Sequence, residues 1–194
     1  SEMCIRDSSF KSLTVFLAIF CLHMNLTGES NPHKFIDSQS QEMVSIIINN
    51  QELFDEDPDL FKDKISKVFE PMVDFRRVGA RVMGKKYYLS SSKSQRLEFI
   101  QAFKNSLLDT YTSTLAQWGD QRIETVFPEV FENKNIEDVQ QNLITASNIY
   151  PITYKVRKNK SGDWLIINII VNGVNLGLTF RNQFQALAKE HNEN

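Results

Sequence analysis

The sequence predicts an α+β fold, with a helical N-terminal half packed on a twisted antiparallel sheet of about four strands and a C-terminal helix after the sheet. Two changes of pattern predict it. From residue 31 to about residue 121 the apolar residues recur at helical spacing, whereas from Arg122 they alternate with polar residues as in strands. After Gly173 the helical spacing returns, at Leu176, Phe180, Phe184 and Leu187. Because helices and antiparallel sheets each have an apolar face to bury, we expect the helices to cover one side of the sheet.

The first thirty residues are typical of a secretory signal. A lysine precedes ten apolar residues, Leu13 to Leu22, a run too short to cross a bilayer but of the right length for the apolar region of a signal peptide. A small-x-small site at residues 28–30 predicts cleavage after residue 30. Residues 1–8 fit neither the signal nor the fold and are interpreted as artefactual. We therefore expect residues 1–30 to be removed on export.

The mature chain, residues 31–194, is expected to be one domain, long enough to bury a core of its own. Both cysteines, Cys4 and Cys21, precede it, so no disulfide is expected within the domain. Outside residues 1–30 the chain holds 20 lysines and arginines against 21 aspartates and glutamates, a balance that argues against a dedicated nucleic-acid binder. We expect a monomer with no metal ion and no cofactor.

Capping residues mark three helix starts. Asn31 and Asp57 each precede a proline, which suits the first position of a helix because an N–H there would have no partner within the helix. Ser92 is followed by Gln95 in the S-x-x-Q pattern of a capping box. The helix after Ser92 carries an apolar face about half its circumference wide, from Leu97 to Trp118, which we expect to be mostly buried.

The strands are best marked late in the chain. Residues 152–157 alternate, a polar turn with a glycine follows at residues 159–163, and Trp164 to Val171 forms a second strand, so the two strands are expected to form a hairpin. Residues 122–131 and 139–147 are weaker strand candidates. The second strand of the hairpin is apolar on both sides, with Trp164, Ile166 and Ile170 expected on one of them. It is either a central strand covered by helices on both faces or a strand with one face lining a cavity for an apolar ligand.

Sequence signals for catalysis, nucleotides or metals are weak. The histidines lie at positions 23, 33 and 191, near the ends of the chain, where none is placed to act as a general base in a core. The segment from Gly79 to Lys86 satisfies G-x-x-x-x-G-K, but Lys86 stands where a nucleotide-binding loop needs Ser or Thr, so the glycines are interpreted as close-packing points of helices. The acids among residues 55–59 are interpreted as complementing a helix start rather than as metal ligands.

Many residues follow the order and spacing of one family. In the first half they are Asp74-Phe75, Arg81 to Gly84, Tyr87-Tyr88, the cap from Ser92 to Arg96, Phe99, Ala102-Phe103, Leu107-Leu108 and Tyr111. In the second half they are Tyr154, Gly162 to Trp164, Gly173-Val174 and Arg181 to Phe184. Over essentially the whole mature chain the sequence resembles the MlaC family of periplasmic phospholipid-binding proteins, also called toluene-tolerance auxiliary components. Asn168 and Asn172 stand where that family often has acids.

The resemblance implies a soluble periplasmic phospholipid carrier that moves lipids between the outer membrane of a Gram-negative bacterium and an inner-membrane ABC transporter, and so maintains the lipid asymmetry of the outer membrane. The implied partners are a phospholipid, the transporter complex with its lipid-binding subunit, and an outer-membrane lipoprotein complex. Acyl chains are expected in an apolar cavity between the sheet and the helices. Because each buried methylene gains about 0.8 kcal/mol, a carrier must shield nearly the whole tail.

Two groups of residues are predicted to carry this function. The lipid-lining group lies on the broadest apolar faces and comprises Val78, Val82, Met83, Phe103, Leu107, Tyr111, Trp164, Ile166 and Ile170. The partner-docking group is a run of cations without an intervening acid and comprises Arg76, Arg77, Arg81, Lys85 and Lys86. If the helix persists through its glycines, Arg77, Arg81 and Lys85 form one basic row, suited to steering an acidic partner.

Two other functions remain open. An isomerase or dehydratase on a similar cone-shaped α+β fold would need an acid or a base in its cavity, for which Asp74 and Asp109 are the candidates. A structural adaptor would close the same apolar faces into an ordinary core. A phospholipid that co-purifies with the protein would favour the carrier over both.

Overall fold

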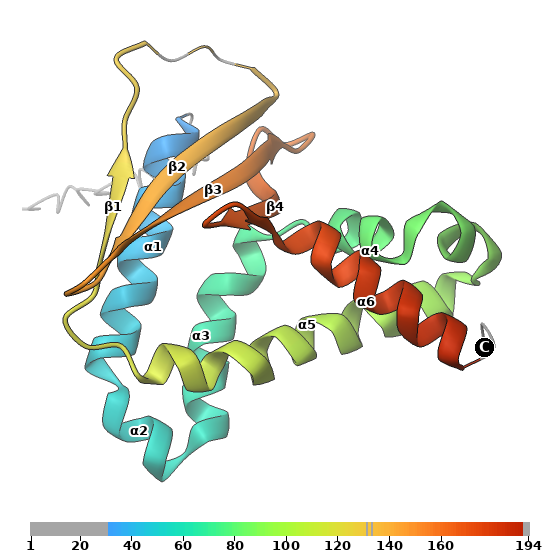
Figure 1. The fold of residues 1–194 in the computed structure, drawn as a ribbon, viewed down its shortest axis with the longest axis horizontal. Helices are drawn as coiled ribbons and strands as arrows, with labels where there is room; N and C mark the ends of the chain where they lie inside the picture. Colours follow the sequence, from blue (N-terminus) through green and yellow to red (C-terminus); the bar gives the residue numbers. More distant parts are fainter. Residues whose placement is uncertain (1–30, 131, 133, 192–194) are drawn as a thin grey trace, which may run out of the picture.

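The computed structural model describes residues 31–130, 132 and 134–191, so the predicted signal peptide lies outside the described residues. The elements in chain order are α1 (Pro32–Asn49), α2 (Gln51–Glu56), α3 (Pro58–Met72), α4 (Phe75–Ser90), α5 (Lys93–Ala116), β1 (Arg122–Val126), β2 (Ile136–Ile144), β3 (Ile149–Lys158), β4 (Trp164–Val171), β5 (Val174–Asn175) and α6 (Leu176–Glu190). Figure 1 shows α1 and the sheet at one end, α4 and α6 at the other, and α5 running between the two ends. The predicted α+β fold is confirmed.

All three predicted helix starts are confirmed by side-chain caps. The side chains of Asn31 and Asp57 accept backbone N–H groups of the first helical turn at 2.8 and 3.0 Å. Ser92 and Gln95 form the reciprocal box, in which each side chain accepts the backbone N–H of the other residue, at 3.2 and 2.8 Å. These bonds satisfy amides that have no partner within the helix.

The sheet has five antiparallel strands in the order β1-β2-β3-β4-β5, one more than predicted. The hairpin of β3 and β4 is confirmed, and the two weaker candidates correspond to β1 and β2. The additional strand, β5, pairs with the end of β4 across the turn formed by Asn172 and Gly173. Both turn residues have positive φ angles, 47° and 80°, as hairpin turns that match the twist of a sheet require.

A β-bulge in β4 changes which side chains share a face of the sheet. The pairing with β3 skips Ile167, which is the extra residue of the bulge. Beyond this residue the alternation is inverted, so Ile169 shares the core face. Ile170 lies on the opposite face from Trp164 and Ile166, and the prediction that grouped these three residues is wrong because simple alternation has no place for an extra residue.

Two buried clusters form the core at one end of the molecule. One lies between the sheet and helices α1 and α3 and comprises Ile36, Met72, Val139, Val156, Trp164 and Ile166. The other joins α1, α3 and α5 and comprises Ile47, Phe61, Ile65 and Leu108. We call helices α1 to α3 together with the sheet the platform.

A chain of polar side chains also crosses the platform. The Ser40 hydroxyl donates to Gln141 Oε1 at 3.0 Å, and the Gln141 amide donates to the Thr125 hydroxyl at 2.8 Å. Thr125 in turn donates to Asp37 at 2.7 Å. Because Gln141 is fully buried, these bonds replace those it would make with water and fix α1 against β1 and β2.

The opposite end has fewer buried side chains. Its centre is a cluster of half-buried aromatic rings from three helices: Tyr87, Phe99, Phe103, Phe180 and Phe184, with ring centroids 5.0 to 5.9 Å apart. In α6, all of which is described, no residue is buried. We call α4, the first half of α5 and α6 the aromatic lobe.

Two expectations about α4 and α5 are not met. The broad apolar face of α5 is not mostly buried, since Leu97 is 54% exposed, Tyr111 is 41% exposed, and only Leu108 and Thr112 of this described helix are buried. Helix α4 is kinked at Gly84, which has the non-helical angles φ 72° and ψ 167° that favour glycine. Residues after the kink therefore do not extend the predicted basic row.

Candidate functional site

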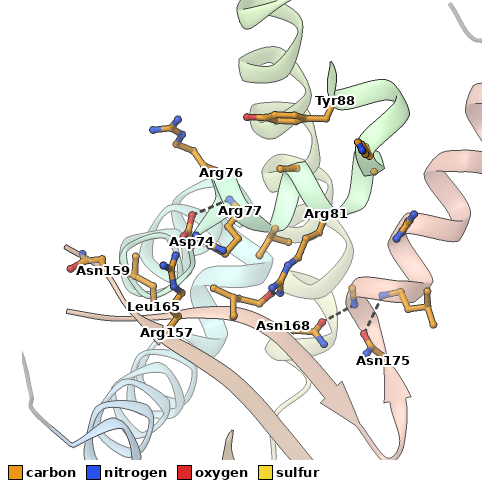
Figure 2. A pocket seen from close by; sticks show the side chains of 18 of the residues that line it. Asp74, Arg76, Arg77, Arg81, Tyr88, Arg157, Asn159, Leu165, Asn168 and Asn175 are labelled. Carbon is orange, nitrogen blue, oxygen red and sulfur yellow. Dashed lines mark hydrogen bonds and ion pairs between the residues drawn. The ribbon is translucent and has the colours of Figure 1, made fainter. Parts of the chain in front are cut away.

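An open cleft of about 1380 Å³ lies where α4, the hairpin end of β3 and β4, and the start of α6 come together (Figure 2). Leu165 and Ile167 line it from β4, while Trp164 and Ile166 of the same strand point into the platform core. Of the two alternatives for this strand, the one in which a face lines a cavity therefore fits. The volume exceeds the roughly 300–1,000 Å³ of ordinary small-molecule pockets, so the cleft has room for a large ligand.

Cations dominate the walls of the cleft. Of its 22 lining residues, eight are Lys or Arg and one, Asp74, is acidic. The cations come from three separate segments of the chain: Arg76, Arg77, Arg81 and Lys85 on α4, Arg157, Lys158 and Lys160 at the hairpin, and Arg181 on α6. Apolar side chains such as Val78 and Leu178 lie among them. A positive cleft with apolar walls attracts a ligand that is both anionic and apolar.

Two arginines of α4 are held in place by neighbouring groups. Arg77 Nε lies 3.5 Å from Asp74 Oδ2, and the other oxygen of Asp74 accepts the Arg77 backbone N–H at 3.0 Å as the cap of α4. Arg81 Nη1 donates to the carbonyl oxygen of Ile167 at 3.2 Å, and Figure 2 shows its side chain pointing from α4 toward the strand. The bulge in β4 thus presents the carbonyl that ties α4 to the sheet.

Two asparagines fix the start of α6 at the rim of the cleft. Asn175 accepts the Leu178 N–H and Asn168 accepts the Gly177 N–H, both at 3.1 Å (Figure 2). A Cβ at Gly177 would overlap the amide oxygen of Asn168, so only glycine allows this close approach. Asn168, one of the departures from the family pattern, therefore caps α6.

The nine residues predicted to line a lipid cavity are not gathered in this cleft. Val78 lines it, whereas Trp164 and Ile166 lie in the platform core, each only 2% exposed. The others lie on three elements: Val82 and Met83 buried on α4; Phe103 and Leu107 half-buried and Tyr111 exposed on α5; Ile170 half-buried on β4. Periodicity identifies faces that are buried or apolar, but it does not distinguish burial by the protein from burial by a ligand.

The predicted docking cations lie largely along the cleft. Four of the five line it, and Lys86 is exposed beside it on α4. The cations contributed by the hairpin and by α6 were missed. A signal for part of them is present, because residues 155–160 contain four cations in six positions. Arg181 carries no such signal, since only the fold brings α6 beside α4.

The residues proposed for other chemistries have structural roles. Asp74 caps α4, and Asp109 is exposed on α5 with Lys62 at 3.0 Å. Burial lowers the pKa of His33 at the start of α1. Gly79 lies within a helix rather than in a loop after a strand, and a Cβ there would lie 2.8 Å from Ile100, so its interpretation as a close-packing point is confirmed.

The described part of the chain has neither a clustered set of metal-ligand side chains nor a membrane-spanning helix. No group of three or more His, Cys, Asp or Glu side chains there is arranged to hold a metal ion. None of the helices described is long and apolar enough to cross a membrane.

The fold and the cleft together define a class: single-sheet α+β domains with an open cationic cleft beside the last strands. Comparison with known proteins then identifies the family. The model of the MlaC protein family matches residues 37–193, and the chain belongs to this family.

Known relatives agree with this assignment. The chain is 31% identical to the toluene tolerance protein ttg2D of Pseudomonas putida over 186 residues, which are 95% of this chain and 84% of the relative. It is 27% identical to the intermembrane phospholipid transport system binding protein MlaC of Haemophilus influenzae, over 86% of this chain and 79% of that protein. A solved phospholipid-binding protein from Ralstonia solanacearum, in complex with a phospholipid, has the same fold, with a TM-score of 0.74 at 18% identity over 85% of this chain and 90% of the other.

Proposed function

We propose that this protein is a periplasmic phospholipid carrier that moves lipids between the outer membrane and an inner-membrane ABC transporter. Membership of the MlaC family supports the proposal, as do a relative that is the binding protein of an intermembrane phospholipid transport system and a protein of the same fold that was solved with a phospholipid. The observation that carries it is the cleft, in which cations and apolar side chains line one open space, as an amphipathic ligand requires.

The acyl chains are proposed to enter between the outer face of β4 and the aromatic lobe. In that lobe the clustered aromatic rings are half-buried and α6 has no buried residue, and each methylene that the lobe shields contributes about 0.8 kcal/mol. Seven predicted lining residues lie on the elements that would meet a tail: Val78, Val82, Met83, Phe103, Leu107, Tyr111 and Ile170. Trp164 and Ile166 fill the platform core and support the floor of the site from beneath.

The protein is proposed to be exported and then processed. Residues 1–30, of which residues 1–8 are interpreted as artefactual, contain a cleaved signal, and residues 31–194 form the mature lipid-binding domain. N-terminal sequencing of the exported protein checks this. A mature form that retains residues 13–22 in a membrane fraction would contradict it.

The partners are proposed to be the lipid-binding subunit of the transporter complex and an outer-membrane lipoprotein complex. The cations of α4 supply weak, salt-sensitive docking, because rim charges raise encounter rates more than affinity. Arg76, Lys85 and Lys86 are exposed and suited to this role, whereas Arg77 and Arg81 are partly engaged within the protein. Charge reversal at Lys86, which does not line the cleft, should slow lipid transfer to the reconstituted transporter while leaving co-purified lipid unchanged.

Native mass spectrometry of the purified mature protein tests the function itself. We expect peaks heavier than the polypeptide by the mass of a phospholipid, lost after organic extraction. The protein is proposed to perform no catalysis, so the lipid should be recovered chemically unchanged. A preparation from the periplasm that carries no lipid, and takes none up from vesicles, would contradict the carrier and favour a structural adaptor. Conversion of the lipid would favour an enzyme.

A further inference from the structure

Three arginines surround a short stretch of β4 within the cleft. Arg157 lies opposite Leu165 in the pairing of β3 with β4. On the other edge of β4 the Asp74 N–H donates to the Ile166 carbonyl at 3.0 Å, which brings Asp74 and its partner Arg77 beside the strand. Arg81 completes the set through its bond to the Ile167 carbonyl. Consecutive strand residues are about 3.3 Å apart, so the three positions at which Arg157, Asp74 and Arg81 meet β4 span roughly 7 Å of strand.

These three charges are poorly neutralised by the protein. Asp74 is the one acid among the residues that line the cleft, and its carboxylate forms an ion pair with Arg77. Arg81 donates to a neutral carbonyl, and Arg157 is half-buried without an ion pair to any acid in the described ranges. Arg77 and Arg157 are half-buried, and taking a guanidinium partly out of water without a full counter-charge is unfavourable, so an anion would complete the arrangement.

The chemistry of that anion follows from the donors and from the floor beneath them. Guanidinium groups match the oxygens of a phosphate with paired hydrogen bonds, better than an ammonium does. Leu165 gives the same stretch a partly exposed apolar side chain, on which the first carbons of a lipid can lie. Lys160 adds positive charge close by and would repel a headgroup ammonium.

We propose that Arg77, Arg81 and Arg157 bind the phosphate of the lipid headgroup, and that the excess of cations makes the protein select phospholipids with a net negative charge. This inference rests on the proposed carrier function and adds headgroup selection to it. Arg157 is the residue best suited to a test, because Arg77 and Arg81 also hold α4 in place. Arg122 on β1 is the matched control, an exposed arginine on the sheet outside the cleft.

The experiment incubates lipid-free mature protein with vesicles of equal parts phosphatidylglycerol and phosphatidylethanolamine, and quantifies the extracted bound lipid by mass spectrometry. The wild-type protein should be enriched in phosphatidylglycerol. Arg157→Gln should lower the ratio of bound phosphatidylglycerol to bound phosphatidylethanolamine by about threefold to tenfold, which is the usual contribution of a partly exposed charge-assisted hydrogen bond. Arg122→Gln should leave the ratio unchanged, and moderate salt should reduce the wild-type preference.

Two additional arms make the result decisive. Arg157→Lys keeps the charge but not the paired hydrogen-bond geometry, so its lipid ratio should lie between those of the wild type and Arg157→Gln. If a thermal melt shows that Arg157→Gln is unfolded, Arg157→Lys takes its place in the test. Inorganic phosphate at constant ionic strength should not change the ratio, since the free ion has no tail. If it abolishes the preference, the site binds free phosphate and the proposal is wrong.

The remaining outcomes separate the two proposals. Equal uptake of both lipids by the wild type, or an unchanged ratio in folded Arg157→Gln, overturns headgroup selection and leaves the carrier intact. Equal loss of both lipids in folded Arg157→Gln also overturns selection, because the arginine then contributes affinity alone. Absence of any bound lipid in the wild type overturns the carrier itself.

Discussion

The platform and the aromatic lobe are built from similar residues but are packed very differently. In the platform Ile36, Ile47 and Phe61 have no exposed surface, and the fully buried Gln141 has hydrogen-bond partners. In the aromatic lobe five aromatic rings are all half-buried, and α6 has no buried residue. Both regions are rich in apolar side chains, so the difference is not one of composition. The platform contains closed buried clusters, whereas the aromatic rings at the centre of the lobe stay half-buried.

This difference predicts where the protein is stable and where it opens. Segments with few buried contacts unfold locally at lower free energy than a closed core does. The cleft lies on the boundary, with β4 of the platform on one side and α4 and α6 of the lobe on the other. A lipid can therefore enter by moving the lobe while the platform stays intact.

The largest contrast should come from matched aromatic truncations. Phe61→Ala in the platform is expected to lower the free energy of unfolding by about 3–5 kcal/mol, because a closed core cannot fill the cavity. Phe184→Ala in the lobe should cost roughly 1–2 kcal/mol, since its ring is only half-buried. Urea unfolding of the lipid-free protein measures both. Equal losses would mean that the lobe is as closed as the platform.

A second test uses pH to probe the platform. Burial raises the pKa of Tyr154 to about 12, an effect that a hydrogen bond with Ser40 opposes in part. The folded state therefore favours the neutral phenol, whose stabilising contribution is complete below about pH 10 and is lost as pH rises toward 12. This loss should reach roughly 2–3 kcal/mol.

Tyr154→Phe should remove this contribution to the fall of the free energy of unfolding at alkaline pH. The measurement is the free energy of unfolding of both proteins between neutral and alkaline pH. The difference between the two proteins at pH 7 gives the cost of removing the hydroxyl, and it is subtracted at every other pH. Parallel slopes in the two proteins would place Tyr154 in contact with solvent and weaken the description of a closed platform.

A third test concerns the junction between the two regions. Gly177→Ala should lower the free energy of unfolding by about 1–3 kcal/mol, because the added Cβ would overlap the Asn168 side chain. Gly119→Ala is the control, since a Cβ there would meet only Gln121 at 3.7 Å. In an Asn168→Ala background the cost of Gly177→Ala should shrink, and purely additive losses would show that the overlap is not the cause.

The smallest effect is expected at the start of α5. Ser92→Ala removes one half of the capping box and should cost about 1 kcal/mol. Thermal unfolding of the lipid-free protein measures this loss. Ser94→Ala, two residues further along the same helix, is the control. A loss of several kcal/mol would indicate that α5 carries more of the fold than its exposed first turn implies.

What was predictable from the sequence was local. The cap at Ser92 and Gln95 spans three residues, and the hairpin of β3 and β4 is marked by its own turn, so both were predicted correctly. The bulge at Ile167 presents its carbonyl to an arginine on α4, and the kink at Gly84 lies beside an arginine on α6, so both bring together parts of the chain that are far apart in sequence. No periodicity contains that information.

The candidate site shows the same limit. The cations of α4 were visible as a run, but their convergence with Arg157 and Arg181 was not, because the three segments lie far apart in the sequence. The prediction that the apolar face of α5 is mostly buried was wrong. A lipid-binding protein needs apolar surface that it does not bury itself, and such surface has the same sequence pattern as a core.

Hydrogen exchange of the lipid-free and lipid-loaded protein tests the central claim most directly. If the lobe takes up the lipid on a closed platform, loading should slow exchange in α4, α6 and the outer part of β4. The amides of α1 and α3 should exchange at the same slow rates in both states. Protection that appears mainly in α1 and α3, or is spread evenly over the chain, would contradict the division of the molecule into a closed platform and an aromatic lobe that takes up the ligand.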